Sequence, residues 1–251
     1  NGNLDFHGAS STYASHALHA FAAKFPPQLP GVFIEFLTQP HDIVLDPMMG
    51  SGTAILEALL LGRRAVGVDI DPLAVRLCRA KTNRVAPPAL ADAAQSARYR
   101  AFAYLSDRAA VQREIERRFD AATLSFVDYW FLPETQQELM ALLMAIEKEA
   151  DSDLAELLRI ILSSIIITKS GGVSRATDLA HSRPHRVASK KPRSPIEQFN
   201  IQIREAIAAL KELPTELPQV ELHQADACNL PLATSSVDLV ITSPPYANAI
   251  D

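Results

Sequence analysis

The residues best suited to chemistry are Ser243, Pro244, Pro245 and Tyr246, near the end of the 251-residue chain. An apolar stretch, residues 237–242, precedes them and predicts a buried strand. The two prolines fix φ and lack N–H donors, so the carbonyl groups of this turn are held in place with few internal partners. A hydroxyl, rigid carbonyls and an aromatic ring suit a flat base with an exocyclic amine. The alternative is a strand terminator followed by a core tyrosine.

A second candidate site begins at Asp46, at the end of a strand predicted over residues 42–46. The glycine-containing loop after it opens a helix predicted over residues 54–61, and a second strand over residues 65–69 ends at Asp69. This order predicts half of a doubly wound parallel sheet. In such a sheet, an acid at the position of Asp69 binds a ribose hydroxyl.

The glycine loop lacks the features of the common phosphate-binding loops. A dinucleotide loop has a third glycine where this chain has Ile55, and a P-loop has a lysine directly after its second glycine. A loop of this kind with acids near it, Asp46 and Asp69, suits a positively charged cofactor without phosphate, and we expect S-adenosylmethionine. Asp226 follows a strand predicted over residues 219–223. It could accept a hydrogen bond from the adenine amine, or it could form a turn.

The middle of the chain, residues 87–218, lacks strand signals and predicts a helical insertion. Helices are predicted over residues 98–119, 133–150, 153–168 and 195–213. An aromatic cluster, residues 129–131, is interpreted as a packing anchor for these helices, and the alternative is a base-stacking surface.

A basic segment with two glycines lies inside this insertion and predicts a long mobile loop. Its charged residues are nearly all positive, in a chain whose net charge is -5. We therefore interpret the segment as a source of phosphate contacts. The alternative is an ordinary solvated face. The residues expected to contact nucleic acid are Lys169, Arg175, Arg183, Arg186, Lys190, Lys191 and Arg193.

The composition, 48% hydrophobic and 21% charged, is that of a globular protein. The acidic net charge excludes a uniformly basic surface, so nucleic acid must meet a local patch. Cys78 and Cys228 are far apart, and His16 and His19 have no acidic or cysteine neighbours, so no metal site is predicted. No signal peptide opens the chain, and its most apolar run, residues 157–167, is too short to span a bilayer. We expect a cytoplasmic protein without membrane contact.

Taken together, these motifs resemble the DNA amino-methyltransferase family, whose members use S-adenosylmethionine to produce N4-methylcytosine or N6-methyladenine. Residues 46–53 look like the family's cofactor loop, D-P-F-x-G-S-G-T, with Met48 in place of phenylalanine. The resemblance implies catalytic roles for Ser243, Pro244, Pro245 and Tyr246. It implies cofactor contacts for Lys24, Phe25, Asp46, Pro47, Met48, Gly50, Ser51, Gly52, Thr53, Asp69, Ile70, Asp226 and Ala227.

The expected fold is α/β, a Rossmann-like methyltransferase sheet with a helical insertion. We expect residues 1–86 to hold the cofactor half, residues 87–218 the insertion, and residues 219–251 the catalytic half. Further strands of the sheet are expected beyond Asp251.

The resemblance implies site-specific DNA methylation. It favours cytosine N4 over adenine N6, because a serine at the start of the catalytic motif is more typical of the family's cytosine-N4 members. A cytosine-C5 enzyme needs a cysteine at the catalytic turn, and this turn has none. The alternatives are methylation of RNA or of a protein amide, or a non-catalytic cofactor- or DNA-binding subunit. The expected partners are DNA, ahead of RNA, and a restriction endonuclease; the oligomeric state is left open.

Overall fold

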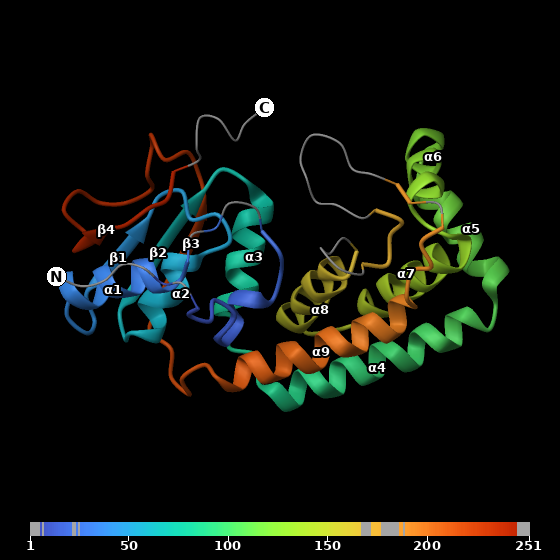
Figure 1. Ribbon diagram of the computed structural model, residues 1–251, viewed down its shortest axis with the longest axis horizontal. Helices are drawn as coiled ribbons and strands as arrows, with labels where there is room; N and C mark the ends of the chain where they lie inside the picture. Colours follow the sequence, from blue (N-terminus) through green and yellow to red (C-terminus); the bar gives the residue numbers. More distant parts are fainter. Residues whose placement is uncertain are drawn as a thin grey trace. The chain divides into compact units, whose positions relative to one another are not determined.

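The computed structural model describes residues 6, 8–21, 24, 26–166, 172–176, 186–187 and 189–244. The chain divides into two compact units, one of residues 1–84 with 208–251 and the other of residues 85–207. The first unit holds the sheet, and the second is built from helices (Figure 1).

The sheet of the first unit is parallel. Its strand order within the described residues is β3-β2-β1-β4, and every neighbouring pair runs in the same direction. The strands are β1 (Ile43–Asp46), β2 (Arg64–Asp69), β3 (Val220–Gln224) and β4 (Leu239–Val240). All carboxyl ends therefore meet at one edge, which is where open α/β sheets bind ligands. The expected Rossmann-like α/β fold is confirmed.

The last strand is shorter than the expected residues 237–242, because its pairing with β1 begins through a side chain. Asp238 N donates to Ile43 O at 2.9 Å, and Ile43 N donates to Asp238 Oδ2 at 2.8 Å. The carboxylate thus takes the place of a ladder carbonyl. The backbone alignment continues past the strand, since Ile241 N donates to Leu45 O at 2.9 Å.

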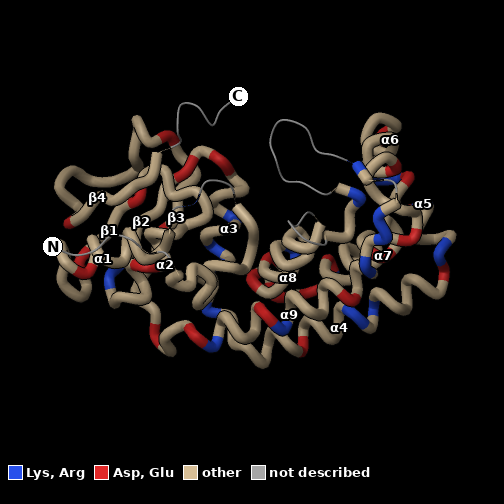
Figure 2. The backbone as a smooth tube through the Cα atoms, viewed as in Figure 1, with Lys and Arg blue, Asp and Glu red and all other residues tan. Residues whose placement is uncertain are grey.

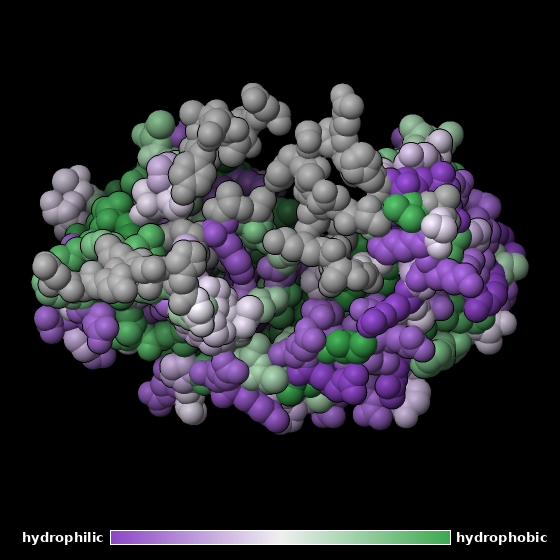
Figure 3. All heavy atoms as spheres, in the orientation of Figure 1, coloured by the Kyte–Doolittle hydropathy of each residue, from purple (hydrophilic) through white to green (hydrophobic). Residues whose placement is uncertain are grey.

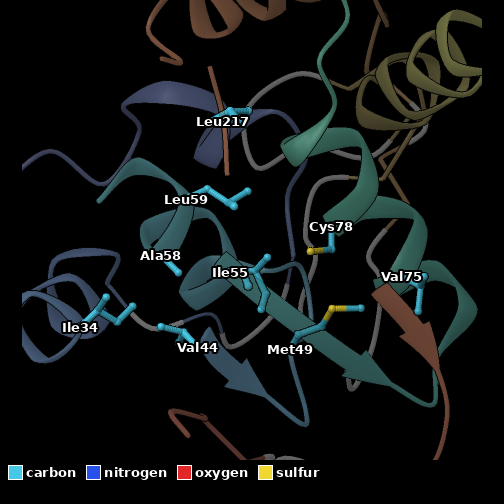
Figure 4. Packing of buried hydrophobic residues seen from close by; sticks show 10 residues of the cluster. Ile34, Val44, Met49, Ile55, Ala58, Leu59, Val75, Cys78 and Leu217 are labelled. Atoms are coloured by element: carbon cyan, nitrogen blue, oxygen red, sulfur yellow. The ribbon is translucent and has the colours of Figure 1, made fainter. Parts of the chain in front are cut away.

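Four helical segments belong wholly to the first unit within the part of the chain that is described: η1 (Ala14–Ala17), α1 (Gln28–Leu37), α2 (Thr53–Leu60) and α3 (Pro72–Thr82). Helix α2 is almost entirely buried, and its residues other than Thr53 and Glu57 are apolar. Asp71 caps α3 by accepting a hydrogen bond from Leu73 N at 2.8 Å. In the core, Met49, Ile55 and Cys78 come together between α2, β2 and α3 (Figure 4).

The helices of the second unit are α4 (Pro87–Leu105), α5 (Arg108–Arg118), α6 (Ala121–Trp130), α7 (Pro133–Ile146) and α8 (Ser152–Ser164), and α9 (Pro195–Lys211) runs from it into the first unit. The single helix expected over residues 98–119 is in fact two. The break occurs because Asp107 leaves the helical conformation and caps α5, accepting a hydrogen bond from Ala110 N at 2.9 Å. Helix α6 was not predicted. Among the described residues, no helix is both long and apolar enough to cross a membrane.

Candidate cofactor-binding and catalytic site

The predicted acids lie along the carboxyl edge of the sheet. Asp46 ends β1 and Asp69 ends β2, and these neighbouring strands pair in parallel. Asp226 comes two residues after the end of β3, where Ala225 N donates to Asp69 O at 3.1 Å. Carboxylates from three separate parts of the sequence are therefore presented at the same edge.

Asp69 ties the glycine loop to the tip of β2. Its Oδ2 accepts a hydrogen bond from Gly50 N at 2.8 Å, and its Oδ1 accepts one from Asp71 N at 2.9 Å. A carboxylate has about four acceptor positions, so two remain on this half-buried side chain. Asp69 can therefore hold the loop and still accept a hydroxyl of a ligand.

Gly52 gives the loop its shape. It lies in the left-handed region, with φ at 79°, and forms the N-terminal boundary of α2. A Cβ at this position would collide with the Sγ of Cys78. Only glycine meets both conditions without strain, so the loop reaches the helix N-terminus in a conformation that the glycine enforces.

The rest of the loop is largely buried. Ser51 and Thr53 are 2% and 3% exposed, and Ser51 Oγ has no hydrogen-bond partner among the residues described. Pro47 and Met48 are half-buried. An unpartnered buried hydroxyl beside the sheet edge is a donor that a ligand could use.

Met49 and Gly67 were not predicted as part of this site. Met49 packs into the core, and a Cβ on Gly67 of β2 would collide with its Sδ. The sequence signal was a glycine inside a strand, which often marks a close approach. Gly67 thus makes room for the methionine beneath the loop.

Asp46 is the most buried of the three acids, with 1% exposure. Burial raises the pKa of its carboxyl to about 6, and the charge of Asp69 adds to this, while Thr242 and the Met48 amide act in the opposite direction. A nearby cation would stabilise the ionised form of this buried carboxyl. It is suited to a positively charged ligand.

Asp226 also accepts a hydrogen bond from the backbone, from Cys228 N at 2.8 Å. It therefore forms the turn that was the alternative interpretation. Its carboxylate is exposed and keeps acceptor capacity, so the turn and a ligand contact are compatible. Ala227 is half-buried in the same turn, and Ile70 exposes 71% of its surface after the tip of β2.

The segment after β4 brings the predicted catalytic residues to the same edge. Because Val240 is in register with Leu45 and Ile241 N donates to Leu45 O, Thr242 and Ser243 follow alongside the end of β1, next to Asp46. Ser243 is half-buried and Pro244 is exposed. Thr242 Oγ1 is buried beside the carboxyl of Asp46 and acts as a hydrogen-bonding group that lowers the pKa of that carboxyl. The predicted stacking residue Tyr246 lies outside the described residues, as does Pro245.

The N-terminal segment lies against the loop. A Cβ on Gly50 would lie 3.0 Å from Cε1 of Phe21, so this ring covers the loop from that side. Lys24, one of the predicted cofactor contacts, is half-buried and donates to His16 O at 3.0 Å. Phe25, also predicted, lies outside the described residues. Phe21 was not assigned a role from the sequence.

A buried polar cluster joins this segment to α2. Tyr13 OH donates to Glu57 Oε1 at 2.7 Å, and His16 Nε2 lies 2.7 Å from the same oxygen. Burial lowers the pKa of His16 although Glu57 acts to raise it. Sequence reasoning missed the cluster; its signal was Glu57, the one acid in an otherwise apolar helix. His16 therefore has a carboxylate partner that is distant in sequence.

Part of the predicted basic segment is described, and it lies against α6 in the second unit. Arg175 N donates to Trp130 O at 2.8 Å, and Ala176 pairs with Arg186 in an antiparallel bridge. The Arg186 guanidinium lies 4.6 Å from the centre of the Tyr129 ring. Lys190, Lys191 and Arg193 are also described, whereas Lys169 and Arg183 lie outside the described residues.

The aromatic cluster at residues 129–131 is only partly the packing anchor that was expected. Phe131 is half-buried and lines an apolar pocket among the helices. Tyr129 is 49% exposed, and Phe126 on the same helix is 61% exposed. Hydrophobic side chains reach the surface here within a mostly hydrophilic region (Figure 3), and Lys and Arg positions gather around α5, α6 and the segment that leads to α9 (Figure 2).

Known DNA methyltransferases are similar to this chain. Residues 6–80 match the family model described as DNA methylase, which covers N6 and N4 methyltransferases. The Type II methyltransferase M.MvaI of Kocuria varians is 25% identical over 263 residues, covering 99% of this chain and 57% of the relative. The Type II methyltransferase M.BglI of Bacillus subtilis is 46% identical over 55 residues, covering 22% of this chain and 16% of the relative.

A third relative, the Type II methyltransferase M.MjaII of Methanocaldococcus jannaschii, is 33% identical over 69 residues, covering 28% of this chain and 13% of the relative. The chain thus spans between 13% and 57% of the length of these three relatives. No solved structure matches the chain.

Proposed function

Since the chain belongs, through its residues 6–80, to the DNA amino-methyltransferase family, we propose that the protein moves a methyl group from S-adenosylmethionine to an exocyclic amine of a DNA base. Cytosine N4 is the favoured target over adenine N6. The observation that carries this proposal is the meeting of two elements distant in sequence. The Asp46–Asp69 edge and the segment that leads to Ser243 lie side by side on neighbouring strands.

The residues of the edge fit S-adenosylmethionine. The buried hydroxyl of Ser51 lacks a partner among the described residues, and the left-handed Gly52 keeps the loop free of side-chain bulk. Asp69 is assigned to the ribose hydroxyls, and the buried Asp46 faces the positive charge of the cofactor. Asp226 and the exposed Ile70 are assigned to the adenine, by hydrogen bond and by packing.

The bound cofactor supplies a methyl group on a positively charged sulfur. Ser243 Oγ and the Pro244 carbonyl accept the two hydrogens of the target amine. These contacts would draw the nitrogen lone pair out of conjugation with the ring and direct it at the methyl group. The N–C bond would form as the S–C bond of the cofactor breaks, and the amine would release one of its protons. Tyr246 stacks on the base. Positioning supplies much of the rate, and a base in a duplex must first be flipped out at a cost of a few kcal/mol.

The second unit is assigned to DNA contact. The described basic residues Arg175, Arg186 and Lys190 lie on a segment attached to α6, together with the predicted Lys191 and Arg193. Phosphate contacts from such a segment position a protein on the duplex without reading its sequence. We further propose a restriction endonuclease as functional partner, because Type II methyltransferases are among the relatives.

A transfer assay tests the proposal and its alternatives together. The full-length protein is incubated with methyl-labelled S-adenosylmethionine and, in parallel, with duplex DNA, RNA and a protein extract. We expect label in DNA alone and its loss in Ser243→Ala. Label in RNA or protein instead would redirect the assignment, and cofactor binding without label in any of the three would identify a non-catalytic subunit.

A further inference from the structure

Helix α3 carries a lysine in an unusual environment. Lys81, in its last turn, is fully buried, and its Nζ has no hydrogen-bond partner among the residues described. Only its backbone is engaged, since Lys81 O accepts a hydrogen bond from Ser15 Oγ at 2.6 Å. A buried ammonium without a partner is strongly unfavourable, and buried charges are normally paired. The position therefore lacks a counter-anion.

The charged neighbours of Lys81 do not provide that anion. Lys24 lowers the pKa of Lys81 and Cys78 acts to raise it, but burial dominates and lowers this pKa to about 7. The positive charge of Lys81 also acts on His16 and His19. These neighbours come from α3 and from the N-terminal segment, and none of them is a carboxylate.

The carboxylate of Glu57 already has hydrogen-bond partners. It accepts a hydrogen bond from Tyr13 OH at 2.7 Å, and His16 Nε2 lies 2.7 Å from the same oxygen. Lys24 Nζ, for its part, donates to a backbone oxygen, that of His16. Two lysines thus face one region in which no described carboxylate pairs with either. An anion from outside the chain would complete it.

This region lies directly behind the cofactor loop. Lys81 is one helical turn beyond Cys78, whose Sγ lies against Gly52. On the other side, Phe21 lies against Gly50, three residues before Lys24. A ligand that rests on the loop is the nearest source of an anion for both lysines.

We propose that Lys81, together with Lys24, binds the carboxylate of the methionyl part of S-adenosylmethionine. This inference rests on the proposed cofactor. The carboxylate is the anionic group of that molecule, whereas its amine and sulfonium are positive. The lysine pair would thus bind the negative carboxylate of the ligand, and the acids of the sheet edge would face its positive groups.

Binding measurements with a matched ligand pair test this assignment. Isothermal titration calorimetry compares S-adenosylmethionine with decarboxylated S-adenosylmethionine on the wild type, on Lys81→Met and on Arg79→Met, a control that removes an exposed charge from the same helix. Lys81→Met should bind S-adenosylmethionine about 10- to 100-fold more weakly, as for a lost hydrogen bond to a charged group. Its affinity for the decarboxylated ligand should match that of the wild type. Arg79→Met should leave both affinities unchanged.

Two results would overturn the carboxylate site. Lys81→Met could bind both ligands as tightly as the wild type does, or it could lose affinity for both equally. The second result would mean that Lys81 only supports the fold.

A second readout needs no variant. Pairing with a carboxylate raises the pKa of Lys81, so the wild type at pH 8 should take up to about one proton from the buffer when S-adenosylmethionine binds. Titrations in two buffers of different ionisation enthalpy measure this uptake. Its absence would overturn the proposal even if Lys81→Met failed to fold.

The two proposals fail in different ways. A wild-type protein that binds neither ligand refutes the cofactor assignment and the lysine site with it. A protein that shows the expected preference for the carboxylate but leaves DNA unmethylated refutes the proposed reaction and supports the lysine site.

Discussion

The carboxylate of Asp69, at the tip of β2, accepts a hydrogen bond from the amide of Gly50 in the loop after β1, at 2.8 Å. The same side chain accepts from Asp71 N, at the start of the next segment. One acid thus fixes the loop and the entry to α3. The proposed ribose contact is therefore made by a group that the fold already holds still.

Replacing this acid should weaken cofactor binding. In Asp69→Ala, the loop loses its anchor and the ribose loses its acceptor, so we expect the affinity for S-adenosylmethionine to fall about 10- to 100-fold, the effect of one strong hydrogen bond to a charged group. Asp42→Ala is the matched control, because Asp42 also accepts a backbone hydrogen bond, from Gln39 N, but lies directly before β1, at the opposite end of the strand from the site. Equal affinities for the two variants would contradict the ribose assignment.

Gly52 should be intolerant of a side chain for two separable reasons. Gly62 has nearly the same φ, 80° against 79°, but a Cβ there meets nothing within 4 Å. Gly62→Ala should therefore cost about 1–2 kcal/mol for the left-handed backbone alone. Gly52→Ala should cost about 1–3 kcal/mol more, because its Cβ collides with Cys78. Urea unfolding measures both.

A double variant isolates the steric part of the stability lost in Gly52→Ala. Adding Cys78→Ala to Gly52→Ala relieves the collision, so the double variant should lose less stability than the two single variants sum to. Strict additivity of the single effects would show that the collision does not govern this position.

Much of the cofactor edge could be predicted from the sequence because it depends on residues that are close together in the chain. The order of strand, glycine loop, helix and strand places Asp46 and Asp69 without knowledge of distant contacts. Lys81 could not be predicted in this way. Its burial depends on contacts such as the hydrogen bond from Ser15, 66 residues away in the sequence. The same holds for Glu57, whose partners Tyr13 and His16 lie in another segment.

The helical insertion shows a different limit. The helical pattern of residues 98–119 continues through Asp107, so periodicity alone does not reveal that this residue caps a new helix. The exposure of Tyr129 is equally invisible locally, because aromatic residues are usually buried.

Asp46 should make the ligand-free protein less stable as the pH rises. Its pKa is raised to about 6 in the fold from an ordinary value of 3.8. The folded state therefore holds a proton that the unfolded state has released between these two values. Stability should be highest below pH 4 for this group and should fall through pH 6 by about 2–3 kcal/mol. Urea unfolding of the wild type and Asp46→Asn measures the difference.

Asp46→Asn removes this contribution without changing the shape of the side chain. The wild type should therefore lose stability relative to the variant between pH 4 and pH 6, and the difference should be constant above pH 7. A difference that does not vary with pH would show that the carboxyl is not protonated in the fold.

The exposed face of α6 should contribute to DNA affinity. Tyr129→Ala should weaken binding by about 1–3 kcal/mol if a base stacks on the ring, and Tyr129→Phe, which keeps the ring, should bind as the wild type does. Arg186→Ala should weaken binding and lower the salt dependence by about one unit. Fluorescence anisotropy over a range of salt concentrations measures these effects.

Arg117→Ala serves as the control for charge. Arg117 is exposed in the same unit and pairs with Glu114 at 2.7 Å. It should change the DNA affinity little. An effect as large as that of Arg186→Ala would mean that net charge, and not the α6 surface, governs binding.

The central claim is methylation of a DNA base amine, and one measurement tests it most directly. The full-length protein is expressed in cells that lack such methylation, and their DNA is digested to nucleosides and quantified by mass spectrometry, with Ser243→Ala as the control. We predict N4-methylcytosine, or else N6-methyladenine, with the wild type and neither with the variant. Unmodified DNA from cells that contain the folded, cofactor-binding protein would contradict the claim.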